Sequence, residues 1–149
     1  MPSERSGESD TREAAASVSD EKMSVFVARS AAATTYSPAN HTGTTNRRLV
    51  GPGALGSGRV EVIRGSIEPG SGALPHRHHG IEQVCYVIAG TARASVGGRT
   101  ADLGPGDCCV FPADTEHTFT ATGDSPAEIL VIYSPPYAER INHETETHQ

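Results

Sequence analysis

The chain has 149 residues, of which 20% are charged, and a formal net charge of -6, which fits one globular domain with a single core. The negative balance, without a stretch of clustered Lys and Arg, argues against a nucleic-acid partner. No apolar run is long enough to cross a membrane and the first residues form no apolar signal segment, so we expect a cytoplasmic protein.

Both ends of the chain are polar, and the pattern of a folded domain lies between them. Residues 1–22 are rich in Ser, Glu, Asp and Ala and are expected to be disordered. A more apolar stretch begins at Met23, and one hypothesis is that Met23 is the true start, which the mass of the native protein would decide. We expect an arm or lid over residues 23–58, a β domain over 59–137 and a flexible tail over 138–149.

Short β-type runs separated by turn residues fill the middle of the chain. The 16 Gly and 10 Pro interrupt the chain too often for long helices, and Gly97-Gly98 is a hairpin turn signal. The expected strands are 59–67, 75–79, 83–89, 91–96, 99–103, 107–111, 117–121 and 128–133. Their number and spacing predict an all-β sandwich or barrel.

The strongest chemical signal is a pair of histidines on one expected strand. His76 and His78 are two residues apart, and alternate residues of a strand share a face, so both imidazoles should point to the same side. Gln83 opens the next apolar strand and can turn its amide oxygen toward the same interior. Gly70 and Gly90 flank the segment.

A second segment has the pattern strand, turn, strand. Gly106 and Pro112 shape the turn, and His117 enters at the start of the following strand. A single histidine is ordinarily a surface or core residue, but three beside the expected Gly and Pro are hard to explain in that way. Three imidazoles and one amide oxygen at a barrel mouth predict one divalent metal ion, with Fe, Ni, Zn and Mn as candidates.

These two segments resemble the two signature motifs of the cupin superfamily. The resemblance covers roughly Val60 to Tyr137, and both motifs occur in the family's order. It implies a cupin-type jelly-roll β-barrel of six to eight strands. The metal ligands that it implies are His76, His78, Gln83 and His117. It also implies a small-molecule substrate and a homodimer.

The sequence departs from the family motif where a ligand Glu is usual. Gln83 stands at that position, with Glu82 one residue earlier; spacing to Gly90 and strand alternation both favour Gln83 and turn Glu82 outward. The arrangement resembles a subset of bacterial cupins that use three His and one Gln. Asp114 replaces the usual turn Gly, and Ala121 replaces the final Asn of the second motif.

Other residues near the motifs are candidates for the site. His41 lies in a polar segment before the barrel that could cover its mouth and supply an acid or base, although an ordinary loop histidine is the commoner case. Glu82 is the other candidate catalytic residue. Cys85 and Val87 should share the inward face of their strand and line a pocket, whereas His79 should face away from the metal.

The expected ligand set is neutral, which bears on the chemistry. A cation held by imidazoles and an amide keeps its full charge, so it should bind more weakly than with a carboxylate but act as a stronger Lewis acid. We therefore expect an enzyme that binds a carbonyl, enol or carboxylate substrate and catalyses isomerisation, elimination or cyclisation. The alternatives are a cupin dioxygenase using Fe(II) or Ni(II) and O2, and a non-enzymatic ligand-binding or sensor cupin.

Overall fold

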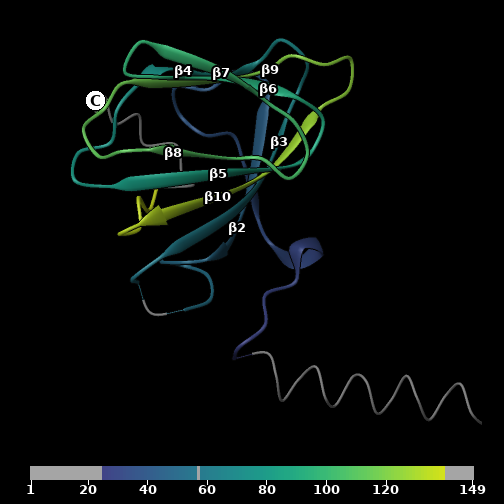
Figure 1. Ribbon diagram of the computed structural model, residues 1–149. Coiled ribbons are helices and arrows are strands. Elements are labelled where there is room, and N and C mark those ends of the chain that lie inside the picture. Colours follow the sequence, from purple (N-terminus) through teal and green to yellow (C-terminus); the bar gives the residue numbers. More distant parts are fainter. Residues whose placement is uncertain (1–24, 57, 140–149) are drawn as a thin grey trace, which may run out of the picture.

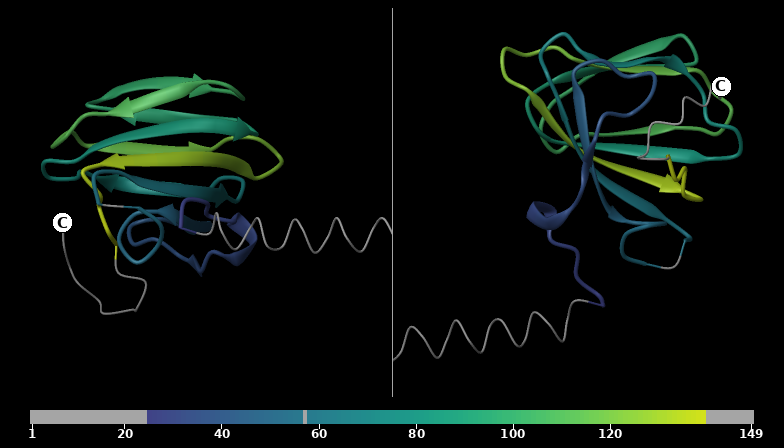
Figure 2. Two further views of the ribbon diagram at one scale, coloured as in Figure 1. Left: turned by 90° about the horizontal axis from the view of Figure 1, so that it is seen from below. Right: turned by 180° about the vertical axis from the view of Figure 1, so that it is seen from behind.

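The computed structural model describes residues 25–139 except residue 57. The expected disordered segment 1–22, the hypothetical start at Met23 and the tail from 140 lie outside these residues. Within them the chain is almost entirely β, which confirms the predicted fold class, and no helix is long and apolar enough to span a membrane. The single helical element of the described residues is the 3-10 turn η1 (Ser30–Ala32), which lies outside the two sheets (Figure 2) and whose Ser30 carbonyl accepts a hydrogen bond from Arg47 at 2.8 Å.

The strands form two antiparallel sheets that face each other (Figure 1). A six-stranded sheet has the order β1-β2-β3-β10-β5-β8, and a four-stranded sheet has the order β4-β9-β6-β7. The bounds are β1 Thr35–Tyr36, β2 Thr44–Val50, β3 Glu61–Ile67, β4 Gly72–His76, β5 Glu82–Ala89, β6 Ala92–Val96, β7 Arg99–Leu103, β8 Cys108–Phe111, β9 His117–Ala121 and β10 Ala127–Ser134. This is the two-sheet jelly-roll arrangement.

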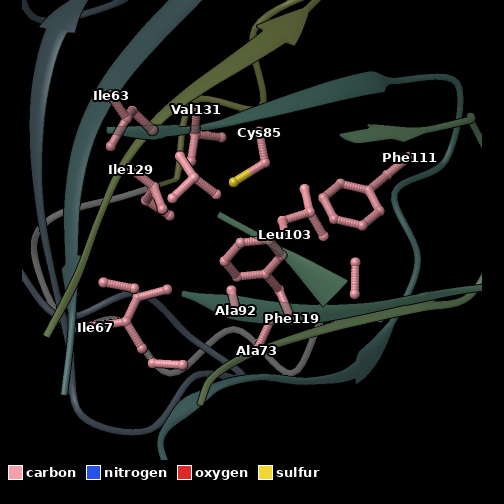
Figure 3. Packing of buried hydrophobic residues seen from close by; sticks show 14 of the residues in the cluster. Ile63, Ile67, Ala73, Cys85, Ala92, Leu103, Phe111, Phe119, Ile129 and Val131 are labelled. Atoms are coloured by element: carbon pink, nitrogen blue, oxygen red, sulfur yellow. The ribbon is translucent and has the colours of Figure 1, made fainter. Parts of the chain in front are cut away.

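The hydrophobic core fills the space between the two sheets. Burial alternates along β3 and β10, as expected for strands with one face covered. Figure 3 shows Ile63 and Val131 of the larger sheet pointing toward Phe119 and Leu103 of the smaller one. Burying each such side chain contributes about 1.5–3 kcal/mol, so the two faces hold the barrel closed.

The N-terminal part of the barrel differs from the prediction. Thr44–Val50, expected in an arm or lid, forms β2 and pairs with β3 along its length. The inward positions of β2 are polar, which is why hydrophobic periodicity gave no strand there. The strand expected over 75–79 instead runs from Gly72 to His76.

Candidate metal centre

Pairing between β4 and β9 brings two of the predicted ligands together. His76 and His117 are register partners, and their ring centroids lie 4.4 Å apart. Gly72 allows the strands to approach: a Cβ at this position would lie 1.9 Å from the Phe119 carbonyl oxygen. The β4–β9 contact therefore depends on glycine at the start of β4.

His78 joins this pair from the connection between β4 and β5. It lies beyond the end of β4. The two histidines therefore do not share one strand face, and this part of the prediction was wrong. The two rings still converge, with His76 Nε2 at 3.2 Å from His78 Nε2. Ligand atoms of His76, His78 and His117 all lie within 4.8 Å of one another.

Gln83 brings an amide to the same end of the barrel. It occupies an inward position of β5 and is 7% exposed. Among the described residues, the buried Gln83 Oε1 and His117 Nε2 have no hydrogen-bond partner, and both residues line one cavity. Buried polar atoms without partners are costly, and a divalent cation would satisfy both, so the donor set fits the predicted metal.

Backbone carbonyls fix the proton position on three histidine rings. In each case Nδ1 lies within hydrogen-bond distance of the carbonyl oxygen two residues earlier: His41 to Ala39 (2.6 Å), His76 to Leu74 (2.6 Å) and His117 to Thr115 (3.1 Å). Because a carbonyl oxygen only accepts, Nδ1 carries the proton and Nε2 keeps a lone pair. Such rings are prepared to act as ligands or bases through Nε2.

The environment keeps the buried imidazoles neutral. Burial lowers the pKa of His78 to about 3, and the neighbouring imidazoles lower it further in the same direction. Burial likewise lowers the pKa of His117 to about 4, against the opposing effect of the Thr115 carbonyl. Neutral rings at pH 7 are the form that binds a metal.

His41 is brought to the centre by a route that the sequence did not indicate. It lies just before β2 and forms an isolated bridge with Ala73 of β4. Its ring centroid lies 5.4 Å from that of His76, and it lines the same cavity as Gln83. The structure thus places His41 at the site as part of the barrel wall.

The remaining candidates divide between the cavity, the core and the surface. Cys85 lines the cavity, and its sulfur points between the sheets (Figure 3); burial raises the pKa of this thiol. Val87 is fully buried in the core but does not line the cavity. Glu82 is exposed and faces away from Gln83 on β5, so it is not brought to the centre. His79 is also on the surface.

The interior beneath the histidines is small. About 20 Å³ of the cavity is accessible to the centre of a water molecule, which is room for one or two waters, whereas sites for organic ligands span roughly 300–1,000 Å³. A substrate must therefore approach from the end of the barrel where the β4–β5 and β8–β9 connections and the end of β10 lie together (Figure 1). We call this end the barrel mouth.

Two tyrosines at the mouth were not recognised from the sequence. Tyr133 and Tyr137 have ring centroids 5.4 Å and 4.5 Å from that of His78. Tyr133 occupies an inward position of β10, so strand alternation could have indicated it. Tyr137 follows β10, and no sequence pattern marks it.

Fold and site together define a small jelly-roll barrel with converging histidines at its mouth. Residues 63–133 match the family model for the cupin domain, so this chain carries a cupin domain and the resemblance seen in its motifs is confirmed.

Comparisons with individual proteins agree with this fold. Mannose-1-phosphate guanylyltransferase ManC of Salmonella typhimurium is 30% identical over 81 residues, 54% of this chain but only 17% of that protein. KdgF from Halomonas sp. has a TM-score of 0.65 at 19% identity, covering 75% of this chain and 94% of that one. The polyketide cyclase RemF from Streptomyces resistomycificus has a TM-score of 0.64 at 21% identity, covering 80% and 85%.

Proposed function

We propose that this protein is a metal-dependent enzyme acting on a small substrate that chelates through carbonyl, enol or carboxylate oxygens, and that it catalyses isomerisation, elimination or cyclisation. The observation that carries the proposal is that two of the buried polar atoms without partners among the described residues, Gln83 Oε1 and His117 Nε2, lie beside the His76 and His78 rings. A structural relative that is a polyketide cyclase supports this class of reaction on this fold.

His76, His78, Gln83 and His117 would hold the cation. When bound, it would supply Lewis acidity toward a substrate oxygen and stabilise negative charge that develops there. The four side chains are neutral, so none of them offsets the charge of the cation.

His41 is the residue best placed to move a proton. Its Nδ1–H is held by the Ala39 carbonyl, so Nε2 has the lone pair that a general base needs. The ring lies beside His76 rather than within the ligand cluster. We propose that Nε2 of His41 takes a proton from a carbon next to the substrate carbonyl and returns it to a neighbouring atom.

The apolar wall of the barrel supports this chemistry by excluding water. Phe111, Phe119 and Val131 line the cavity below the ligands, and Phe111 stacks on the His117 ring at 4.4 Å. A dry environment strengthens the interaction between a cation and an oxyanion.

Metal analysis tests the ligand assignment. Protein purified under anaerobic conditions without chelators should contain about one equivalent of a divalent metal, and His117→Ala should lose it. His79→Ala is the matched control, because it removes an exposed imidazole close to the centre. A wild-type protein that takes up no divalent metal would contradict the proposal and favour a non-enzymatic binding role.

Proton exchange tests the reaction class. Incubated in D2O with a panel of enolisable hydroxy ketones, the wild type should exchange the proton next to a carbonyl, as seen by NMR, without consuming O2. His41→Ala should lower this exchange while metal content stays unchanged. Oxygen consumption with the same compounds would favour the dioxygenase alternative instead.

A further inference from the structure

A buried ion pair lies outside the proposed ligand set. Glu61, the first residue of β3, has no exposed surface, and Arg48 of β2 is 9% exposed. The Arg48 Nε–H donates to Glu61 Oε2 at 2.6 Å, and the guanidinium lies 5.4 Å from the centre of the Tyr36 ring. Burying two charges is expensive unless further hydrogen bonds satisfy them, so the other atoms of this pair should also have partners.

Those partners belong to the segment after β10, residues 135–139, which we call the C-terminal strap. Glu61 Oε1 accepts the backbone N–H groups of Tyr137 at 3.0 Å and Ala138 at 2.9 Å. Arg48 Nη2 donates to the Glu139 carbonyl, and the Ala39 N–H donates to the Glu139 carboxylate. The buried pair therefore ties the strap to the barrel.

The strap places Tyr137 at the mouth. Its ring centroid lies 4.5 Å from that of His78, with the planes tilted by 56°, and the residue is only half-buried. Because the interior is too small for an organic ligand, a substrate must bind where the Tyr137 ring is accessible.

We propose that Tyr137 is a specificity-determining residue that packs against a flat, conjugated part of an oxygen-chelating ligand, and that Glu61 and Arg48 are the positioning residues that hold it there. The inference rests on the proposed function and narrows its substrate class to planar molecules. Aromatic rings attract one another in offset or edge-to-face arrangements, which gives such a ligand an advantage over a chelator without a ring.

Binding of two chelating probes to the Zn(II)-loaded protein tests the role of Tyr137. Tropolone carries two chelating oxygens on a flat ring, and acetohydroxamate carries two without a ring. Calorimetry should show that Tyr137→Ala weakens tropolone binding roughly two- to twelvefold and leaves acetohydroxamate unchanged, while Tyr137→Phe behaves as wild type. Phe26→Ala, at an exposed aromatic position before η1, is the matched control.

Equal weakening of both probes, or no weakening of tropolone, would overturn the inference while leaving the metal proposal intact. Metal content is measured on every sample, so a wild type that takes up no zinc is recognised separately; it would overturn the proposed function and this inference together.

Amide exchange measured by NMR tests the positioning pair. The Tyr137 and Ala138 amides should be protected in the wild type and exchange faster in Glu61→Gln, which should also weaken tropolone binding as Tyr137→Ala does. If Glu61→Gln does not fold, Gly51→Ala replaces it, because a Cβ at this position would lie 3.1 Å from Glu61 Cγ and should displace the Glu61 side chain. Gly53→Ala is the control for this variant, because Gly53 also has a positive φ but has open space around it. Wild-type amides that exchange as fast as in an unfolded peptide would refute the positioning role.

Discussion

Asp114 and His78 are joined across two connections of the barrel: the Asp114 backbone N–H donates to the His78 carbonyl oxygen at 2.9 Å. The Asp114 carboxylate also accepts an exposed hydrogen bond from His79 Nδ1 at 2.8 Å. Asp114 has a φ of +61°, in the left-handed region that glycine adopts without strain. This explains why the family motif usually has Gly here and shows that Asp still makes the turn.

Substitutions at Asp114 should separate the effect of backbone strain from that of the hydrogen bond with His79. Asp114→Ala should lower the free energy of unfolding by about 1 kcal/mol, because Ala is strained at positive φ. Asp114→Gly should stay within about 0.5 kcal/mol of wild type, because an exposed contact between side chains contributes little even when it is ionic. Urea denaturation measures both free energies; a loss in the Gly variant equal to that in the Ala variant would show that the contact with His79 dominates.

Gln83→Glu should change metal affinity and stability in opposite directions. A carboxylate adds a charge interaction with the cation, so zinc affinity should rise roughly 10- to 100-fold, measured by competition with a chelator. Without metal, the nearly buried carboxylate lacks a partner, so the melting temperature should fall. Glu82→Gln, on the exposed face of β5, should change neither quantity, and unchanged affinity in Gln83→Glu would argue against Gln83 as a ligand.

Gly72→Ala should damage both the barrel and the metal centre. The new Cβ would overlap the Phe119 carbonyl oxygen, so β4 must move from β9, and unfolding free energy should fall by more than about 2 kcal/mol. Gly70→Ala is the control, because its φ is also positive but the space around it is open; it should cost about 1 kcal/mol and keep the metal. Equal losses in both variants would mean that backbone strain alone is responsible.

The three cysteines should differ in reactivity. Cys108 is exposed; partial burial raises the pKa of Cys109; and burial raises the pKa of Cys85 most clearly. Since the thiolate is the reactive form, a disulfide reagent at pH 8, applied to a Val110→Glu protein that does not dimerise, should label Cys108 quickly, Cys109 slowly and Cys85 only after unfolding. Mass spectrometry of the labelled peptides gives the order, and rapid labelling of Cys85 in the folded protein would contradict its buried position.

The outer face of the larger sheet is where we propose that two copies of this chain meet. Val62, Ile132, Val84 and Val110 form one row across β3, β10, β5 and β8. Arg64 and Glu128 form an ion pair on the same face, so a two-fold arrangement can match apolar with apolar and opposite charges with each other.

Light scattering should therefore give about twice the 15.6 kDa mass of the chain. Val110→Glu, at a half-exposed position of the row, should give a monomer. Thr100→Glu, at an exposed position of β7 in the other sheet, should leave the dimer intact. A monomeric wild type would refute the proposed interface.

Turn residues allowed most strands to be predicted, because Gly and Pro bound them on both sides. β7, for example, runs from Arg99 to Leu103 as expected. The second strand was not predicted, because its inward residues Thr44, Asn46 and Arg48 are polar like most of its outward ones, so no alternation of apolar and polar residues marks it. The pattern of apolar and polar residues within a short segment does not indicate which distant residues the segment will contact.

The same limit applies to the site. The motifs predicted that His76, His78 and His117 meet, although His78 reaches the site from the connection after β4 and not from the strand itself. The hydrogen bonds that connect the Glu61–Arg48 pair to the C-terminal strap join residues up to 91 positions apart, and Ala138 was expected to begin a flexible tail. Only the folded chain shows that a polar strand and the last described residues belong to one network.

Three of the histidine rings at the mouth, those of His41, His76 and His117, are held at Nδ1 by main-chain oxygens. Nothing in that arrangement depends on the identity of the residues that supply the carbonyls. The side chains at those positions can consequently change, in evolution or by design, while the orientation of these rings is preserved. A barrel built in this way can acquire a different substrate while its histidine rings keep their positions.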